Sequence, residues 1–318
     1  MKGKPLLPLL REVDNVLVTS HVNPDGDAIG SVLAATALLK AMRKQAFPVL
    51  QDGIPERFRF LPGAKAVKTT EEAKNAGYTF EATLLVDAGE IDRMGNVEEL
   101  VPEGAPLLVI DHHVSTTHPG GGEIIDTRAS ATCELLAPLF EAMEVKMSPA
   151  AATALYTGIL TDTGRFRFVN TTARALAVAS RLVEAGADPA EITREIYFRE
   201  NPLTTIGLGR FLSRMQLFEQ GRIAISHIPF EEKDIDTEGY IDHLTSLDGV
   251  EIAALLRPLD TKSFKISFRS TGEANVERVA RLFGGGGHEK AAGGTVEGGI
   301  DAVIKKVVKA CRNEFAGL

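Results

Sequence analysis

Hydrophobic residues in the first part of the chain form short runs that alternate with longer helix-like stretches. Four apolar runs predict strands, at residues 16–19, 48–51, 83–86 and 107–110. Longer stretches, several opened by Ser, Thr or Pro, predict helices at residues 28–42, 130–143, 149–161 and 172–185. Apolar strands that alternate with helices are typical of a parallel sheet covered on both faces. The pattern therefore predicts an α/β domain over residues 1–200.

A polar break at Asn201 and Pro202 precedes a second stretch of alternating pattern. Residues 204–219 predict a helix, and we interpret residues 201–219 as a linker helix. After it, residues 222–228, 250–258 and 263–269 predict strands, and residues 275–283 and 300–315 predict helices. The expected fold class is α/β with two domains: a larger, mostly parallel-sheet domain and a smaller α/β domain over residues 220–318, joined by a linker.

Composition narrows the class of protein and of partner. The chain has 318 residues, of which 44% are hydrophobic, so it can bury substantial cores. Its net charge of −8 argues against a surface that holds long nucleic acid, and any nucleic-acid partner is expected to be short. Two cysteines without metal-ligand spacing indicate a reducing compartment. No apolar run has signal-peptide or transmembrane character, so we expect a cytoplasmic protein that binds no membrane.

Acidic and imidazole side chains follow the predicted strands, whose carboxyl ends meet at one edge of a parallel sheet. Taken singly, some have an ordinary interpretation: Asp27 as a helix cap, and Asp87 or Asp162 as turn residues. Together, however, five carboxylates at one edge would repel one another without a cation. The full set comprises His21, Asp25, Asp27, Asp87, Asp111, His112, His113 and Asp162.

The types of these side chains indicate which metal they would bind. Imidazole and carboxylate ligands without thiolate favour Mn²⁺, with Mg²⁺ or Co²⁺ as other occupants. The set offers more ligands than one cation needs, so we predict two divalent ions that activate water and clamp a phosphoryl group. Metal-assisted hydrolysis is the predicted chemistry.

A second motif lies near the C-terminus, where residues 284–287 are all glycine and His288 follows. One glycine after Phe283 would suffice to end a helix, whereas four let backbone N–H groups approach a phosphate closely. The residues alone leave a flexible loop and an anion cradle as equal alternatives. Three basic residues could contact a terminal phosphate or base, or could simply lie on the surface: Arg257, Arg269 and Lys290. His118 could line the cleft or lie in a solvated loop.

These motifs resemble those of the DHH phosphoesterase superfamily. Residues 21–27, 87–89, 111–113 and 161–164 resemble its four N-terminal motifs, and residues 284–293 resemble the glycine-rich signature of its DHHA1 domain. The resemblance spans nearly the whole chain in order. The compact size and the Arg269–Ser270 pair are most similar to its nanoRNase branch, the bifunctional oligoribonucleases and 3'-phosphoadenosine 5'-phosphate (PAP) phosphatases. Glu289 departs from the family, whose members often have proline there.

The resemblance also implies a role for each candidate residue. One ion would be bound by His21 and Asp25, the other by Asp27, His112 and Asp162, and Asp87 would bridge them. His113 would contact the substrate phosphate, and Asp111 would orient the histidines. The substrate-binding residues of the second domain would be Arg269, Ser270, Gly285, Gly286, Gly287 and His288.

Together with the predicted metal site, the resemblance implies a dinuclear-metal phosphodiesterase that hydrolyses very short oligoribonucleotides to mononucleotides. The resemblance adds small 3',5'-phosphorylated nucleotides as substrates, with PAP converted to AMP, and implies a homodimer. The main alternative is a phosphodiesterase for linear or cyclic dinucleotides such as pGpG and pApA. A pyrophosphatase and a catalytically inactive nucleotide sensor are weaker alternatives.

Overall fold

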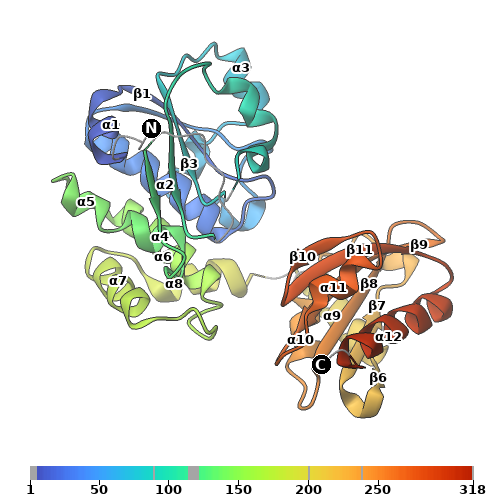
Figure 1. Ribbon diagram of the computed structural model, residues 1–318. Coiled ribbons are helices and arrows are strands. Elements are labelled where there is room, and N and C mark those ends of the chain that lie inside the picture. The colour runs from blue at the N-terminus through green and yellow to red at the C-terminus, as the bar shows by residue number, and fades with distance from the viewer. Residues whose placement is uncertain (1–5, 89, 114–121, 200, 238, 317–318) are drawn as a thin grey trace. The chain divides into compact units, whose positions relative to one another are not determined.

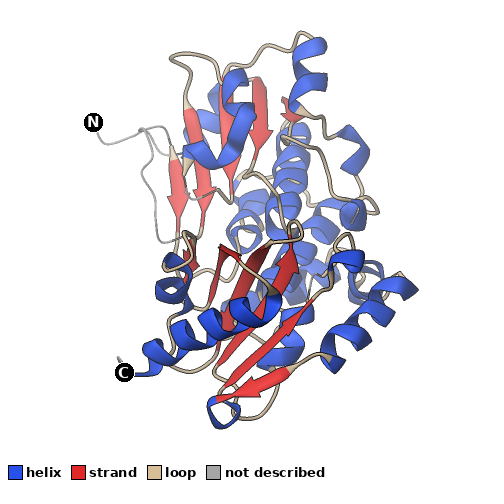
Figure 2. Ribbon diagram, turned by 90° about the vertical axis from the view of Figure 1, so that its right-hand side faces the viewer, coloured by secondary structure: helices blue, strands red, loops and turns tan. Residues whose placement is uncertain are grey.

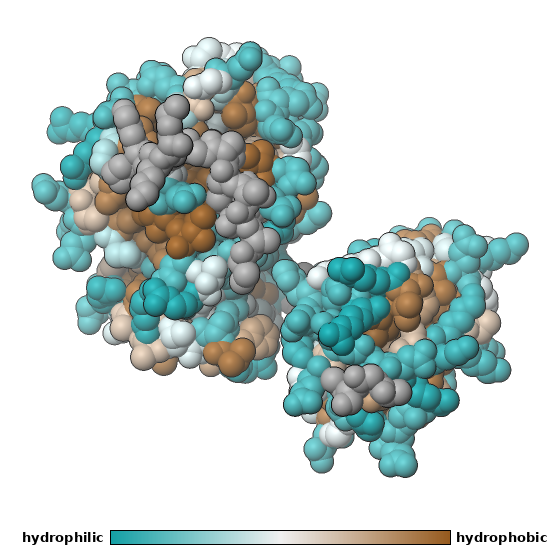
Figure 3. Space-filling model, in the orientation of Figure 1, coloured by the Kyte–Doolittle hydropathy of each residue, from teal (hydrophilic) through white to brown (hydrophobic). Residues whose placement is uncertain are grey.

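The computed structural model describes residues 6–88, 90–113, 122–199, 201–237 and 239–316 (Figure 1). The chain divides into two compact units, Met1–Arg199 and Glu200–Leu318. The surface seen in Figure 3 is mostly hydrophilic, with hydrophobic residues gathered in small areas of each unit. Among the described residues, no helix combines the length and the apolar character needed to cross a bilayer.

The first unit is built on a five-stranded parallel sheet in the order β2-β1-β3-β4-β5. In β1, Val16 and Val18 enter one hydrophobic core while Leu17 enters another, so both faces of the sheet are covered. The strand order places a topological switch point between β1 and β3, where ligands of such sheets bind. The strands are β1 (Asn15–Thr19), β2 (Gln45–Pro48), β3 (Ala82–Val86), β4 (Leu107–Asp111) and β5 (Glu123–Ile125).

Helices cover both faces of this sheet. The larger core contains residues of most of the helices, and its central helix α2 packs along α6. The smaller core lies under α3 and a 3₁₀ segment at Ile91–Leu100. The α-helices are α1 (Leu6–Glu12), α2 (Gly26–Ala41), α3 (Thr70–Asn75), α4 (Thr132–Leu136), α5 (Leu139–Ala142), α6 (Pro149–Asp162), α7 (Ala173–Glu184) and α8 (Pro189–Tyr197), with further 3₁₀ turns at Glu56–Phe58 and Ala64–Ala66.

The second unit contains a six-stranded mixed sheet in the order β10-β11-β9-β8-β7-β6, with helices packed against its strands (Figure 2). Strands β7 and β8 are parallel, and the other neighbouring pairs are antiparallel. One core involves α11 and α12, and a second, on the other face of β8, involves α9 and α10. The strands are β6 (Gln216–Phe218), β7 (Ile223–His227), β8 (Ile252–Pro258), β9 (Ser263–Ser270), β10 (Gly286–His288) and β11 (Ala291–Glu297). The helices are α9 (Pro202–Ser213), α10 (Tyr240–Thr245), α11 (Val276–Arg281) and α12 (Ile300–Ala316), with 3₁₀ turns at Glu219–Gly221 and Phe230–Glu232.

The two-domain α/β fold class is confirmed, but three predicted elements differ. The helix expected at 130–143 is divided into α4 and α5, because Pro138 has no N–H to continue the helical ladder. The strand expected at 48–51 is β2 at Gln45–Pro48, since those residues pair with β1. The helix expected at 204–219 ends at Ser213, and Gln216–Phe218 pair with β7 instead. The residues interpreted as a linker helix therefore fall within the second unit.

Candidate active site

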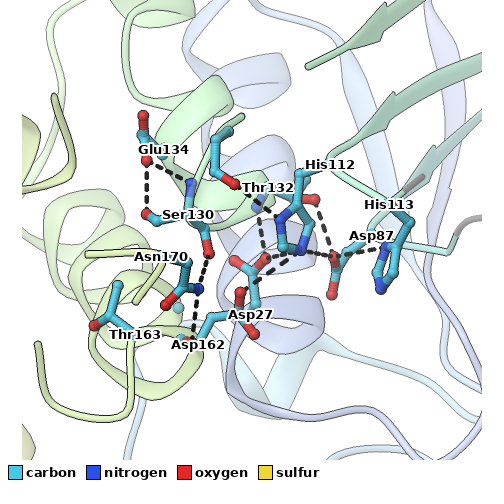
Figure 4. A network of polar contacts seen from close by, with 12 residues as sticks. Asp27, Asp87, His112, His113, Ser130, Thr132, Glu134, Asp162, Thr163 and Asn170 are labelled. Atoms are coloured by element: carbon cyan, nitrogen blue, oxygen red, sulfur yellow. Dashed lines mark hydrogen bonds and ion pairs between the residues drawn. The ribbon is translucent and has the colours of Figure 1, made fainter. Parts of the chain in front are cut away.

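The predicted metal-binding side chains of the first unit gather beyond the carboxyl ends of β1, β3 and β4. They form three overlapping groups, each with ligand atoms within 4.8 Å of one another. Asp87 and His112 each belong to two groups, so the residues form one continuous cluster. Figure 4 shows the part of it that contains Asp87, His112 and Asp162. The groups are His21 with Asp25 and Asp87, Asp87 with His112 and His113, and Asp27 with His112 and Asp162.

The start of α2 supplies two of these carboxylates. Asp25 caps the helix, because its Oδ1 accepts hydrogen bonds from the backbone N–H groups of Asp27 and Ala28, each at 3.0 Å. Asp27 lies in the first turn and accepts hydrogen bonds from the backbone N–H groups of Thr132 at 2.6 Å and Cys133 at 3.0 Å. The interpretation of Asp27 as the cap is therefore wrong, since Asp25 occupies that position.

Asp87 follows β3 directly and occupies the centre of the cluster. Its φ of 55° lies in the left-handed region, which is uncommon for a residue other than glycine and is concentrated at functional sites. The side chain is 2% exposed, and its Oδ1 accepts a hydrogen bond from Thr132 Oγ1 at 2.9 Å. Asp87 Oδ2 lies 3.8 Å from His21 Nε2, and Oδ1 lies 3.5 Å from His112 Nε2. Asp87 therefore faces imidazoles that follow two other strands.

The rings of His21 and His112 are oriented through their Nδ1 atoms. His21 Nδ1 lies 2.8 Å from the carbonyl of Val22, and His112 Nδ1 lies 3.2 Å from the carbonyl of Ala129. Donation of the Nδ1 proton to these carbonyls leaves each Nε2 lone pair facing the carboxylates. This is the tautomer that a metal-binding imidazole requires.

Asp111 orients His113 through its side chain. Its Oδ1 lies 2.7 Å from His113 Nδ1 and accepts hydrogen bonds from the backbone N–H groups of His112 and His113. Burial alone would raise the pKa of Asp111, but the hydrogen bonds and charge of His113 outweigh it and lower that pKa. The role expected of Asp111 toward both histidines thus applies to the ring of His113, while the ring of His112 contacts Ala129.

Close packing of α2 against α6 brings Asp162 to the cluster. A Cβ at Gly158 would lie 2.6 Å from Asp27 Oδ1, and a Cβ at Gly26 would clash with Thr161. These glycines permit the two helices to approach, so that Asp162, the last residue of α6, reaches His112 with 3.6 Å between Oδ2 and Nε2. Figure 4 shows Asp27 and Asp162 on the same side of His112.

A second layer of polar residues, which the sequence analysis did not identify, supports the cluster. Asn170 Nδ2 donates to the backbone carbonyls of Asp162 and Ser130, both at 3.1 Å. Ser130 donates from its backbone N and its Oγ to the buried Glu134, which pairs with Arg174. These contacts hold the turn before α4, whose first residue, Thr132, reaches Asp87. Sequence spacing gives no signal for them, because the partners come together through the tertiary fold.

The cluster has an excess of negative charge. Burial, followed by repulsion from Asp27, raises the pKa of Asp87 well above its ordinary value. The same two causes raise the pKa of Asp162 to about 7. Burial lowers the pKa of His112, but the carboxylates of Asp27 and Asp162 outweigh that effect and raise it. Each of these shifts indicates a site that lacks positive charge.

Divalent cations fit this set of residues. The separations of 3.5–3.9 Å between the imidazole and carboxylate atoms exceed hydrogen-bond length. They are close to the spacing of roughly 3–3.5 Å between neighbouring ligand atoms that each lie about 2.1 Å from one ion. Nitrogen and carboxylate oxygen without sulfur is also a donor set for hard or borderline divalent metals. The geometry and the charge of the cluster therefore agree.

In the second unit, the second half of the glycine-rich tract belongs to a strand, whereas Gly284 lies in a turn after α11. Gly286–His288 form the edge strand β10, which pairs with β11 in a hairpin. A Cβ at Gly285 would clash with the carbonyl of Gly293, so close backbone packing requires that glycine. Gly286, in contrast, has no atom near its Cβ position and is exposed.

Three of the predicted substrate-binding residues share one face of this sheet. His288 pairs with Ala291, which pairs with Arg269, and Gly286 pairs with Gly293 two residues along. Directly paired residues point to the same face, so the side chains of His288 and Arg269 lie on the same face as Gly286. Neighbouring residues of β9 and β11 point the other way, into the core. We name this surface of β10, β11 and β9 the open face.

Two other candidate side chains of the second unit form hydrogen bonds with its own backbone. Ser270 Oγ donates to the carbonyl of Ala274 at 2.8 Å, and Lys290 Nζ donates to the carbonyls of Gly272 at 2.6 Å and Ala274 at 3.0 Å. Both side chains therefore hold the turns beside the open face. Arg257 is half-buried in β8. Two positions singled out from the sequence lie outside the described residues, Gly89 and His118.

The fold and the site define a metal-dependent phosphoesterase. The model of the DHH family N-terminal domain matches residues 15–159, and that of the DHHA1 domain matches residues 220–316. The chain belongs to the DHH family, as its motifs predicted.

Individual relatives match over nearly the whole chain. The bifunctional oligoribonuclease and PAP phosphatase NrnA of Thermus thermophilus is 33% identical over 318 residues, covering 99% of this chain and 94% of the relative. The protein of the same name from Bacillus subtilis is 28% identical, covering 89% and 90%. A crystal structure of an exopolyphosphatase-related protein from Bacteroides fragilis has a TM-score of 0.90 at 27% identity, covering 96% and 94%.

Proposed function

We propose that this protein hydrolyses very short oligoribonucleotides to mononucleotides and converts PAP to AMP, with two Mn²⁺ ions as cofactors. The near full-length similarity to a relative named as an oligoribonuclease and PAP phosphatase supports the substrate class. The net charge of −8 supports short over long nucleic acid, because a long strand needs an extended basic surface. The observation that carries the chemistry is the buried Asp87 carboxylate, which faces imidazoles on two sides.

The side chains divide naturally between two ions. We assign His21 and Asp25 to one ion, Asp27, His112 and Asp162 to the other, and Asp87 to both. When bound, the cations would activate a water molecule and neutralise charge that develops on the phosphoryl group. The protein contributes ligand positions that are fixed before substrate arrives, since backbone N–H groups hold Asp27 and a hydroxyl holds Asp87.

His113 is assigned to the substrate phosphate. Asp111 engages its Nδ1, so Nε2 is the ring atom available for a phosphoryl oxygen. The second unit is assigned to the far end of the substrate, with Arg269 and His288 as phosphate-binding side chains around the exposed Gly286.

The direct test is a time course of hydrolysis by the purified protein with Mn²⁺. The substrates are 5'-labelled RNAs of two, three, five and twenty-four nucleotides, with PAP and pyrophosphate beside them. We expect the shortest RNAs to be converted rapidly to mononucleotides, PAP to yield AMP, and the longest RNA to be degraded slowly. A chelator-treated sample measures the background.

Other results would contradict the proposal or narrow it. Consumption of pyrophosphate alone, or of no substrate at all, would reject it. Cleavage of pApA or pGpG far faster than the trimer would instead favour the dinucleotide phosphodiesterase considered from the sequence.

A further inference from the structure

The loop after Asp162 carries two adjacent exposed hydrophobic side chains. Phe168 is 55% exposed and Val169 is fully exposed. Single exposed hydrophobic residues are common on protein surfaces, but here an aromatic and a β-branched residue stand together a few positions beyond a metal-site carboxylate. Among the described residues, neither side chain belongs to the metal-ligand groups or to a hydrophobic core of the first unit.

This exposure does not come from a loosely held segment. The carbonyl of Thr163 accepts hydrogen bonds from the backbone N–H groups of both Arg167 and Phe168, each at 3.0 Å. Thr163 Oγ1 accepts from the N–H of Phe166 at 3.1 Å, and the carbonyl of Phe168 accepts from the N–H of Thr171 at 3.0 Å. The loop therefore holds Phe168 at the surface by a network of backbone hydrogen bonds.

Gly164 explains how the ring is placed. Its φ is 55°, and a Cβ there would clash with three atoms at the far end of the Phe168 ring. The ring tip thus lies against the backbone of Gly164, which must be glycine both for its conformation and for this contact. Gly164 follows Asp162 by two residues, so their Cα atoms are at most about 7.6 Å apart. The ring is consequently fixed within a nucleotide's reach of the cluster.

The same loop is tied to the cluster and carries positive charge. Asn170 donates to the carbonyls of Asp162 and Ser130, so the end of the loop is joined to the turn that supports Asp87 (Figure 4). Arg167 is exposed, and its Nε donates to the carbonyl of Gly164 at 2.8 Å. An exposed aromatic ring beside a cationic side chain is the combination that binds single-stranded nucleic acid.

We propose that Phe168, with Val169 beside it, is the platform on which a base of the substrate stacks while the adjacent phosphate lies at the cluster. This inference rests on the proposed function and identifies residues that bind the nucleobase in the first unit. Every base presents a π-face, so such a platform would favour nucleotides over other phosphate esters without selecting a base sequence. It also gives a role to Gly164, because this glycine determines where the Phe168 ring lies.

The test compares pApA with an abasic analogue in which hydrogen replaces both bases. KM and kcat are measured with Mn²⁺ for the wild type, Phe168→Ala and Phe168→Trp. In the wild type we expect KM for the abasic analogue to exceed that for pApA by roughly tenfold, the contribution of one stacked base. In Phe168→Ala this ratio should fall toward one because KM for pApA rises, and Phe168→Trp should preserve it. Phe198→Ala, at a residue 72% exposed at the end of α8, is the matched control and should keep the wild-type ratio.

Two results would overturn the inference: a wild-type ratio near one, or an unchanged ratio in Phe168→Ala. If the wild type hydrolyses no dinucleotide, the proposed function fails, and calorimetric titration of the Mn²⁺-loaded protein then decides the inference separately. We expect AMP to bind more tightly than ribose 5-phosphate by roughly tenfold, with the difference lost in Phe168→Ala. Equal binding of the two ligands would reject the platform.

Discussion

The cluster of the first unit and the open face of the second unit, which we propose bind opposite ends of the substrate, are built in opposite ways. In the cluster, Asp27 and Asp87 are 1% and 2% exposed, and each accepts a hydrogen bond from Thr132. On the open face, Gly286 and His288 are exposed, and the strand that carries them lies at the edge of its sheet. Hydrolysis requires metal ligands at fixed positions, whereas the binding of short substrates that vary in sequence requires backbone groups that are accessible to the substrate. We therefore expect substitutions in the cluster to affect kcat and substitutions on the open face to affect KM.

The largest effect is expected from Asp87→Asn. The amide keeps the shape of the side chain but removes the charge that both ions would share, so kcat should fall by roughly a thousandfold or more. Hydrolysis of a labelled dinucleotide measures the effect, and Asp52→Asn, at an exposed position, is the control. More than a few per cent of wild-type activity in Asp87→Asn would contradict the bridging assignment.

A smaller decrease in kcat, again from a change in the cluster, is expected from Thr132→Val. This change removes the hydroxyl that donates to Asp87 but preserves the shape of the side chain and the backbone N–H that donates to Asp27. Substitutions of residues that orient metal ligands cost about 10–100-fold in activity or metal affinity. We expect kcat to fall by that factor and half-saturation to require more Mn²⁺.

The control for this prediction is Thr205→Val, at an exposed threonine of α9. A Thr132→Val enzyme whose Mn²⁺ titration and kcat both match those of the wild type would show that Asp87 needs no such support.

Substitutions at two neighbouring glycines, Gly285 and Gly286, should separate an effect on substrate binding from an effect on folding. Gly286→Ala adds a methyl group where no atom lies within 4 Å, so the fold should be retained while KM for short RNA rises by roughly tenfold. Gly285→Ala instead places a methyl group against the carbonyl of Gly293 and should lower the melting temperature. Gly299→Ala, also in open space, is the control for both. An unchanged KM in Gly286→Ala would remove this strand from the substrate-binding surface.

Strands that are rich in apolar residues could be predicted from the sequence. Strands that form only because they pair with a distant strand could not. The apolar run that forms β4 was clear, but β11 contains Ala-Ala-Gly-Gly, which lacks the β-branched and aromatic residues that indicate a strand. Its identity depends on pairing with β9 over seven residues. Edge strand β10 could not be predicted for the same reason, since its glycines are equally typical of a loop.

In the site, the side chains that gather in the cluster could be anticipated because ligand chemistry restricts which residue types can bind a metal. The residues that support these side chains could not be anticipated. Thr132 contacts Asp87 across 45 residues of sequence, and Asn170 acts through backbone carbonyls, which carry no sequence signature. The contact between Gly164 and Phe168 is local in sequence, yet it depends on a left-handed glycine conformation that a motif alone does not reveal.

The smallest effect concerns the stability of the metal-free cluster and its dependence on pH. In an unfolded chain an Asp carboxyl has a pKa of about 3.9, whereas burial and the Asp27 carboxylate raise the pKa of Asp162 to about 7 in the folded protein. The folded state therefore binds more protons than the unfolded state between these values, and the free energy of unfolding must decrease as the pH rises from 4 to 7. The raised pKa of Asp87 acts in the same direction.

We accordingly expect chelator-treated protein to melt at a temperature roughly 5 °C lower at pH 7.5 than at pH 5.5. Asp162→Asn removes one of the titrating groups and should reduce this difference, whereas Asp52→Asn should leave it unchanged. Saturating Mn²⁺ should abolish or reverse it, because cations stabilise the ionised carboxylates that repel one another in the metal-free protein. A metal-free protein that is equally stable at both pH values would show that the cluster relaxes without cations, and the contrast between a fixed, buried cluster and an exposed open face would then lose its physical basis.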